Sequence, residues 1–306
     1  MKRAFLKVIL SICILSLSLC GLSGCGEEPG KIPPAPTYSR TLRIGIIPEQ
    51  DVFAQKKRYQ PLADYVSHNL GINIELVMLP RYGNIINNFN GERLDGAFFG
   101  SFTCALALMR LQIVPLARPE WKDGSSTCFG MLFVRKDSAI HNGADMRGKS
   151  FAFVDQATTA GYLLPLHYFA EEGIGDYRAW FKEVYFAGTH EAVIEDVLNK
   201  RADIGAAQNR IFYRLALADK RVLDELEILA TSPEVPANSL AVKSDLDQQT
   251  LTALKDCLLE MDRDPKGRAV LETFGAIRYI ETTVSDFKPV FDYARHIDLD
   301  LTRYQY

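Results

Sequence analysis

The stretch KSFAFVDQATTAGYLLPLHYFAEEG, residues 149–173, joins a predicted strand to a predicted helix through a turn with two threonines and a glycine. Its first part alternates and then runs apolar, as a buried strand does, and its second part has apolar residues at helical spacing up to Gly173. Thr158 and Thr159 therefore precede a helix N-terminus, where unpaired backbone N–H groups and the positive end of the helix dipole can hold an anion. Taken alone, the stretch favours ordinary capping of the helix by one of these threonines.

Predicted strands and helices alternate through much of the chain. Before the opening stretch, strands at 41–48, 72–80, 94–100 and 112–120 are separated by helices at 59–71, 82–92 and 101–111. After it, strands at 182–188 and 202–208 are each followed by a helix, which completes a second wound unit. Short connections in a βαβαβ order predict a parallel sheet in each unit.

Two extended apolar segments, residues 128–137 and 238–245, lie between these units. They predict an α/β fold of two wound α/β lobes joined by two crossing hinge strands, with a ligand cleft between the lobes. We assign residues 41–135 and 241–306 to lobe 1 and residues 136–240 to lobe 2. Helices predicted after residue 245 are expected to return to lobe 1.

The N-terminal region indicates export and anchoring. Lys2 and Arg3 precede an apolar run, which predicts a signal peptide at residues 1–24. The run ends at LSGC, residues 22–25, which resembles the lipobox of bacterial lipoproteins, so Cys25 is predicted to carry a lipid. Residues 25–40 are proline-rich and predict a flexible tether. The expected location is the cell envelope, lipid-anchored on the periplasmic or extracytoplasmic face.

Composition and cysteine spacing exclude several classes of protein. The net charge of −3 argues against general nucleic-acid binding. Cys104, Cys128 and Cys257 would remain in the mature chain, either with one bridge between Cys104 and Cys128 or as three buried free thiols. Their spacing predicts no metal site, and we expect no cofactor. The chain has no nucleophile elbow, P-loop or HExxH motif, so we do not expect an enzyme.

Five stretches in this order carry a resemblance to a known family. They are LPRYGNII (79–86), LDGAFFGSFTCALAL (94–108), MRGKSFAFVDQATTAGYLLP (146–165), GTHEAVIEDVLNKRADIGAA (188–207) and PEVPANSLAV (233–242). They resemble the phosphate, phosphite and phosphonate binding proteins of ABC importers, the PhnD-like family, which implies the periplasmic binding protein type 2 fold. The family motif Ser-Thr-Ser-Gly-Tyr reads here Thr-Thr-Ala-Gly-Tyr, so Ala160 removes one hydroxyl expected to face the oxyanion.

The resemblance and the residues together predict a ligand-binding site. The resemblance assigns the phosphorus-bearing group to the Thr158–Gly161 motif, Tyr82 and His190. Near the end of the third strand, Gly100 permits close backbone approach, Ser101 offers a hydroxyl and Phe99 an apolar wall. The complete predicted set is Tyr82, Phe99, Gly100, Ser101, Thr158, Thr159, Ala160, Gly161, His190, Gln208 and Asn238.

Selectivity is inferred from Gln208 and Asn238, which lie in the stretches where family members that bind aminophosphonates use acidic side chains. Because these stretches carry no carboxylate, we expect a ligand without an ammonium group. Two interpretations of Arg210 stay open, a contact for a second negative charge and a solvated helix residue. The main hypothesis is a lipid-anchored solute-binding protein that delivers an oxyanion to an ABC permease. The alternative is a sensory protein that presents its ligand to a membrane histidine kinase. For that alternative, Cys104 facing the ligand would suit arsenite.

Overall fold

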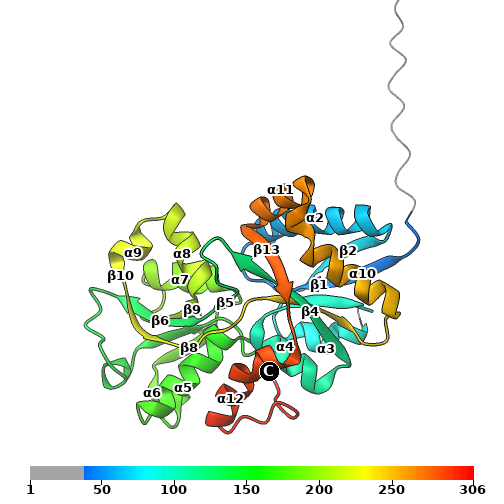
Figure 1. Ribbon diagram of the computed structural model, residues 1–306. Coiled ribbons are helices and arrows are strands. Elements are labelled where there is room, and N and C mark those ends of the chain that lie inside the picture. The colour runs from blue at the N-terminus through cyan, green and yellow to red at the C-terminus, as the bar shows by residue number, and fades with distance from the viewer. Residues whose placement is uncertain (1–37, 92) are drawn as a thin grey trace, which may run out of the picture. The chain divides into compact units, whose positions relative to one another are not determined.

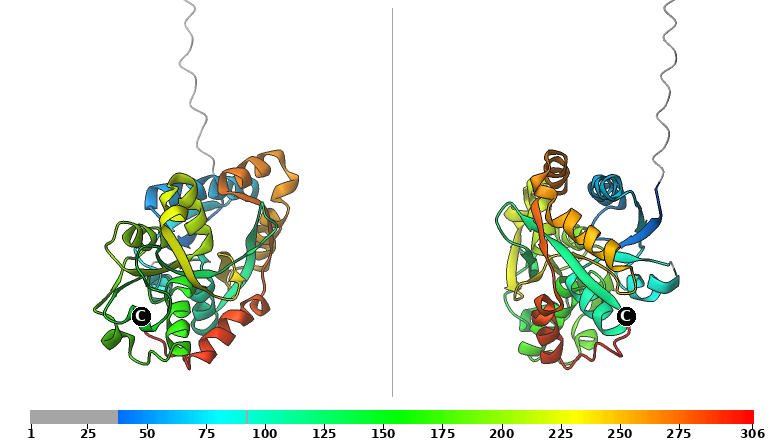
Figure 2. Two further views of the ribbon diagram at one scale, coloured as in Figure 1. Left: turned by 90° about the vertical axis from the view of Figure 1, so that its left-hand side faces the viewer. Right: turned by 45° about the vertical axis from the view of Figure 1, so that its right-hand side comes forward.

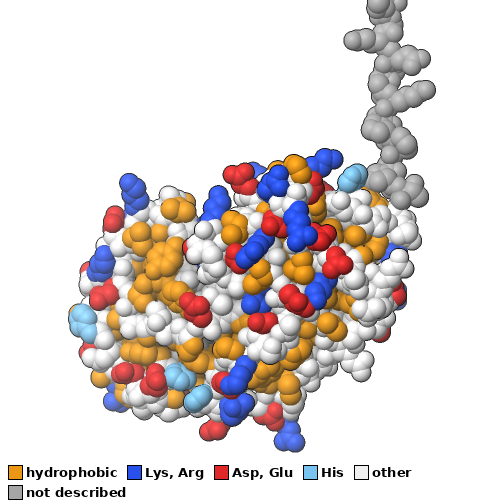
Figure 3. Space-filling model, in the orientation of Figure 1, with side chains coloured by type: hydrophobic (Ala, Val, Ile, Leu, Met, Phe, Trp, Pro, Cys, Tyr) orange, Lys and Arg blue, Asp and Glu red, His pale blue; other side chains and the backbone are white. Residues whose placement is uncertain are grey.

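A computed structural model of the protein describes residues 38–91 and 93–306, which are built around two β-sheets and a short two-stranded ladder (Figure 1). The predicted signal peptide, Cys25 and nearly all of the predicted tether lie outside the described residues. Within the described ranges, no helix is both long and apolar enough to cross a membrane. On the face drawn in Figure 3, side chains of both charge signs are intermixed.

The first sheet is mixed. Its strands are β1 (Thr41–Ile46), β2 (Asn73–Met78), β3 (Gly96–Phe99), β4 (Ile113–Trp121), β12 (Ser239–Lys243) and β13 (Ala276–Glu281). They lie in the order β13-β4-β12-β3-β1-β2. β1 pairs in parallel with β2 and β3, as predicted, but β12 returns from the far end of the chain and runs antiparallel between β3 and β4. The prediction of a parallel sheet is therefore wrong for the half of the sheet that contains β12, β4 and β13, where neighbouring strands are antiparallel.

The helices of the first lobe are α2 (Val52–Leu70), α3 (Asn84–Gly91), α4 (Ser101–Arg110), α10 (Gln248–Leu259), η3 (Met261–Arg263) and α11 (Pro265–Phe274). α2 begins seven residues before the predicted start at Tyr59, because the carboxylate of Asp51 accepts the N–H groups of Phe53 and Ala54 at 3.0 Å. α10 and α11 pack on α2 and share a buried apolar cluster with β1. The blue α2 and the orange α10 and α11 lie together at the top of both views in Figure 2. The predicted return of the late helices to lobe 1 is confirmed.

The second sheet also contains a set of neighbouring parallel strands. Its strands are β6 (Gly130–Arg135), β7 (Ser150–Phe153), β8 (Glu183–Phe186), β9 (Ile204–Gln208) and β10 (Leu226–Thr231), in the order β10-β6-β9-β7-β8. β7 is parallel to β8 and β9, whereas β6 and β10 are antiparallel additions at one side. Its helices are η1 (Ala144–Met146), η2 (Thr159–Leu163), α5 (Leu164–Glu171), α6 (Tyr177–Trp180), α7 (His190–Leu198), α8 (Asn209–Ala218) and α9 (Arg221–Glu225).

The two lobes are joined where β5 (Thr127–Cys128) pairs antiparallel with β11 (Val235–Pro236). Most of the predicted crossing segments at 128–137 and 238–245 form β6 and β12 instead, because their apolar side chains are buried within the two sheets. β6 thus lies in the second sheet although residues 41–135 were assigned to lobe 1, and the exact lobe boundaries stay a prediction. The chain then continues through η4 (Val284–Phe287) and α12 (Lys288–His296), and α12 contacts α4 and η2, one element from each lobe.

Candidate functional site

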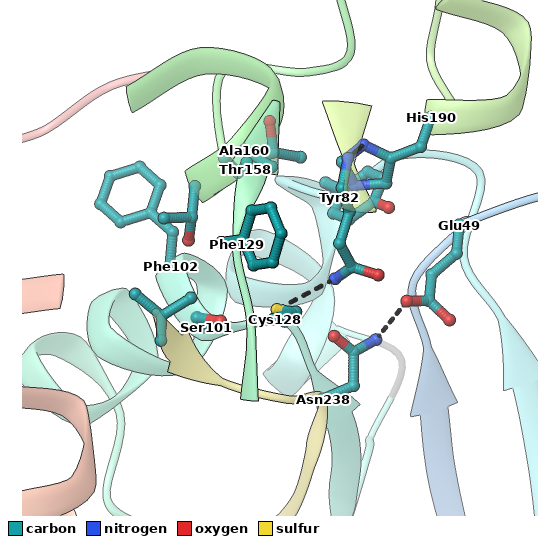
Figure 4. A pocket seen from close by; sticks show the side chains of 16 residues that line it. Glu49, Tyr82, Ser101, Phe102, Cys128, Phe129, Thr158, Ala160, His190 and Asn238 are labelled. Carbon is teal, nitrogen blue, oxygen red and sulfur yellow. Dashed lines mark hydrogen bonds between the residues drawn. The ribbon is translucent and has the colours of Figure 1, made fainter. Parts of the chain in front are cut away.

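A cavity of about 20 Å³ lies at the carboxyl ends of parallel strands from both sheets, and we call it the head-group cavity (Figure 4). Residues that follow β1, β2 and β3 face residues that follow β7, β8 and β9, the position where wound sheets bind ligands. Its wall is formed by Glu49, Tyr82, Gly100, Ser101, Phe102, Cys128, Phe129, Gly130, Ala157, Thr158, Thr159, Ala160, His190, Gln208, Val235 and Asn238.

The two threonines of the opening stretch play different parts. Thr158 stands before η2, a π-helical turn that begins at Thr159, and its hydroxyl donates to the backbone oxygen of Asp155 at 2.7 Å. The hydroxyl of Thr159 is buried and has no hydrogen-bond partner among the described residues. The first N–H groups of such a turn also lack intrahelical partners. Thr159 and the start of η2 therefore supply unused donors to the cavity, whereas the proton of the Thr158 hydroxyl is already engaged.

Tyr82 brings a second unused hydroxyl from the opposite lobe. Its side chain is only 3% exposed, and its hydroxyl oxygen has no partner within the described part of the chain. Burial raises the pKa of Tyr82 well above its ordinary value, so the phenol keeps its proton and can donate it. The ring packs edge-on against that of His190, with 5.8 Å between the ring centroids.

His190 is held as a neutral donor. It is the first residue of α7, whose N-cap Thr189 accepts the N–H of Ala192 at 3.0 Å. Nδ1 of His190 accepts the backbone N–H of Gln208 at 3.2 Å, which assigns the ring proton to Nε2. Burial, together with the charge of Arg214, lowers the pKa of His190 from 6.5 to about 3. The imidazole can therefore donate to an anion without carrying a charge.

Three predicted residues near β3 and η2 have other roles. Ser101 lines the cavity, but its hydroxyl donates to the backbone oxygen of Pro236 at 2.6 Å and so ties α4 to β11. Phe99 is fully buried and stacks on Phe89, with 6.3 Å between centroids, so the predicted apolar wall of the site is wrong for this residue. Gly161 lies behind the cavity wall, where a Cβ would stand 2.3 Å from Cγ2 of Val154.

The polar end of the cavity contains a carboxylate that the sequence analysis missed. Glu49 follows β1 and is 5% exposed, and its Oε1 accepts the side-chain amide of Asn238 at 2.8 Å. Its Oε2 lies 3.9 Å from a guanidinium nitrogen of Arg58. The rule that ligands gather at the carboxyl ends of parallel strands would have found Glu49. The other lining residues that were missed are Phe102, Cys128, Phe129, Gly130, Ala157 and Val235.

The three described cysteines are free thiols, so the bridge between Cys104 and Cys128 is not formed. Cys104 is fully buried in the core and does not line the cavity, whereas Cys128 does and accepts the side-chain amide of Gln208 at 3.3 Å. Burial raises the pKa of Cys128 to about 12, so this group is a thiol. Residues 38–91 and 93–306 contain no group of three or more potential metal ligands.

The geometry defines a class of protein: two α/β lobes that present unused, uncharged donors to a small cavity between them form a solute-binding protein suited to an anion. Solved structures share the fold. A binding protein component of an ABC phosphonate transporter from Pseudomonas aeruginosa has a TM-score of 0.78 at 22% identity and covers 85% of this chain and 87% of its own. PhnD1 from Prochlorococcus marinus in complex with methylphosphonate has a TM-score of 0.74 at 20% identity, and the match covers 86% of this chain and 99% of PhnD1.

The sequence gives the family directly. The model of the family described as "ABC transporter, phosphonate, periplasmic substrate-binding protein" matches residues 44–287, and the chain belongs to this family. The Phosphonates-binding periplasmic protein of Escherichia coli (strain K12) is 27% identical over 246 residues, which are 79% of this chain and 72% of that protein. The PhnD-like resemblance and the periplasmic binding protein type 2 fold are thus confirmed. The family and relatives are transport components, and they give the sensory alternative no support.

We predict that Thr159→Val weakens the binding of methylphosphonate about tenfold to a hundredfold, because it removes one charge-assisted hydrogen bond while keeping the side-chain shape. The same change should leave the free energy of unfolding of the ligand-free protein unchanged or higher, because the hydroxyl has no partner there. Calorimetry and urea unfolding measure the two quantities. Thr282→Val is the control, since the hydroxyl of Thr282 is buried and accepts from Arg118, and this residue does not line the cavity. Equal affinities in both variants would exclude Thr159 from the site.

The low pKa of His190 in the folded protein predicts that the free energy of unfolding depends on pH. Its folded pKa of about 3 lies below the unfolded value of 6.5, so its contribution to stability is complete above pH 6.5 and is lost as the pH falls from 6.5 toward 3. Between pH 7 and pH 5 the ligand-free protein should lose about 2 kcal/mol of unfolding free energy through this group. His190→Asn should lack that loss. A difference between wild type and variant that stays constant over this pH range, measured by urea unfolding, would show that the imidazole titrates in the native protein.

Proposed function

We propose that this chain is the lipid-anchored solute-binding component of an ABC importer and that it holds a phosphorus oxyanion, namely a phosphonate, phosphite or phosphate, in the head-group cavity. The observation that carries the proposal is the pair of buried hydroxyls on Tyr82 and Thr159, which have no partner in the described residues and face one cavity from different lobes. Each buried unpaired hydroxyl costs about 1–3 kcal/mol, and an oxyanion is the acceptor that relieves this cost.

The donor set suits a phosphoryl group. Its oxygens would accept from Thr159 and the start of η2 on one side, and from Tyr82 and Nε2 of His190 on the other. Because these donors come from both lobes, binding would favour the closed arrangement, and the β5/β11 pair would serve as the hinge. The closed form would then dock on a membrane permease and release the anion there.

The proposed ligand has no ammonium group. Glu49 is a carboxylate in the cavity wall, but Asn238 and Arg58 already contact its two oxygens. Gln208 likewise gives its side-chain amide to Cys128. The wall of the head-group cavity thus has no acidic side chain without a partner to receive a substrate amine.

A panel of anions tests the function. At a hundred times the dissociation constant, a ligand stabilises the fold by about 2.7 kcal/mol, which should raise the melting temperature by about 5 °C or more for a chain of this size. We expect such shifts with methylphosphonate, phosphite or phosphate and none with sulfate. If none of the phosphorus anions shifts the melting temperature or gives heat in calorimetry, the proposed function is wrong.

Membrane anchoring is tested at Cys25. We expect Cys25→Ala to move the protein from the membrane fraction to the soluble fraction, because the lipid is proposed to be attached to this thiol. Mass spectrometry of the wild-type N-terminus should find the acyl chains. A variant that stays with the membranes, together with an unmodified wild-type N-terminus, would exclude the anchor.

A further inference from the structure

A second and much larger cavity, of about 1020 Å³, opens beside the head-group cavity, and we call it the outer cavity. Glu49, Cys128, Phe129, Gln208 and Asn238 line both, so the two cavities adjoin each other along these side chains. The outer cavity is bounded by α2 of the first lobe and α8 of the second. It is therefore the space available to the substituent of a bound phosphonate.

The wall of the outer cavity has an excess of positive charge. It carries Lys57, Arg58, Arg210 and Arg214 against only Glu49 and Asp123. Arg210 is paired with Asp123 at 3.3 Å and lies over the ring of Trp121, so Arg210, which the sequence left open as a contact for a second charge, already has its partner. Arg58 faces the sole remaining acidic group of the wall, Glu49, at 3.9 Å.

Arg214 is the cation in this wall that has an unsatisfied hydrogen-bond donor. Its Nη2 is buried and has no hydrogen-bond partner among the described residues. Burial and, after it, the nearby charge of Arg58 lower the pKa of Arg214, while the charges of Glu49 and Glu191 act in the opposite direction. The guanidinium groups of Arg58 and Arg214, from opposite lobes, therefore repel each other across this space. A guanidinium remains charged in proteins, so the repulsion persists at neutral pH.

We infer that the outer cavity recognises a second anionic group on the ligand, a carboxylate or a second phosphoryl group, through Arg214 with Arg58 beside it. The inference rests on the proposed function and names the substrate class: phosphonates whose substituent is itself negatively charged. Such a group satisfies the buried Nη2 and relieves the repulsion between the lobes, and planar guanidinium groups suit carboxylate and phosphoryl oxygens. Glu49 acts on Arg214 through its charge alone, because its oxygens contact Asn238 and Arg58.

The test compares four ligands by calorimetry on the intact protein: methylphosphonate, 2-aminoethylphosphonate, and two ligands with a second anionic group, phosphonoacetate and methylenediphosphonate. We expect phosphonoacetate or methylenediphosphonate to bind at least about tenfold more tightly than methylphosphonate, the value of one charge-assisted hydrogen bond. Arg214→Gln should abolish this preference and change the affinity for methylphosphonate less than about threefold. Arg214→Lys, which keeps the charge, should retain part of it.

The controls separate this inference from the proposed function. Arg303→Gln makes the same change in net charge at a side chain that is 89% exposed and lines neither cavity, and it should preserve the preference. If methylphosphonate binds but the dianionic ligands bind no better, or if Arg214→Gln weakens all ligands equally, the inference fails while the proposed function stands. Tighter binding of 2-aminoethylphosphonate than of phosphonoacetate would also overturn it. If no phosphonate binds, the proposed function fails first.

Discussion

The structure depends on buried donors that face each other across a cleft without an acceptor between them. Tyr82 follows β2 in the first sheet and Thr159 follows β7 in the second, and neither hydroxyl has a partner in residues 38–91 and 93–306. Bringing the lobes together removes both hydroxyls from water, at a cost of about 1–3 kcal/mol each. The proposed oxyanion would convert that cost into charge-assisted hydrogen bonds, so the same side chains would oppose closure without a ligand and favour it with one.

Several polar contacts cross the cleft directly. The backbone N–H of Asp51 donates to Glu191 at 3.1 Å, and Arg81 lies 3.6 Å from Asp155 with 61% of its side chain exposed. Because the side chain of Asp155 is only 4% exposed, the cost of burying its charge offsets part of the attraction to Arg81. The C-terminal segment adds a tie, since the hydroxyl of Tyr304 donates to the backbone oxygen of Gln156 at 2.8 Å. Apolar side chains of both lobes and of α12 also belong to one buried cluster, so packing adds to these polar ties.

The sequence predicts the parts of the fold that depend on local pattern. Alternating strands and helices give the parallel centres of both sheets, and the ends of those strands carry Tyr82, Thr159 and His190 to one cavity. It does not predict pairing between distant segments, which is why β12 between β3 and β4 was missed. The same limit applies to single hydroxyls: the partner of Ser101 is a backbone oxygen 135 residues away, a distance that no motif encodes.

Burial determines that the head-group cavity has neutral hydrogen-bond donors, whereas the outer cavity has charged side chains. The head-group cavity holds His190 as a neutral imidazole because burial lowers the pKa of this side chain, and the positive charge of Arg214 lowers it further. Its donors therefore read the oxygens of an anion by hydrogen bonds whose protonation does not change near neutral pH. The net positive charge lies in the wall of the outer cavity, where Arg58 of one lobe and Arg214 of the other lie near each other. A bound head group would thus meet directional but uncharged donors, and its substituent would meet guanidinium groups, so under the two proposals the substituent adds to the selectivity that the head group provides.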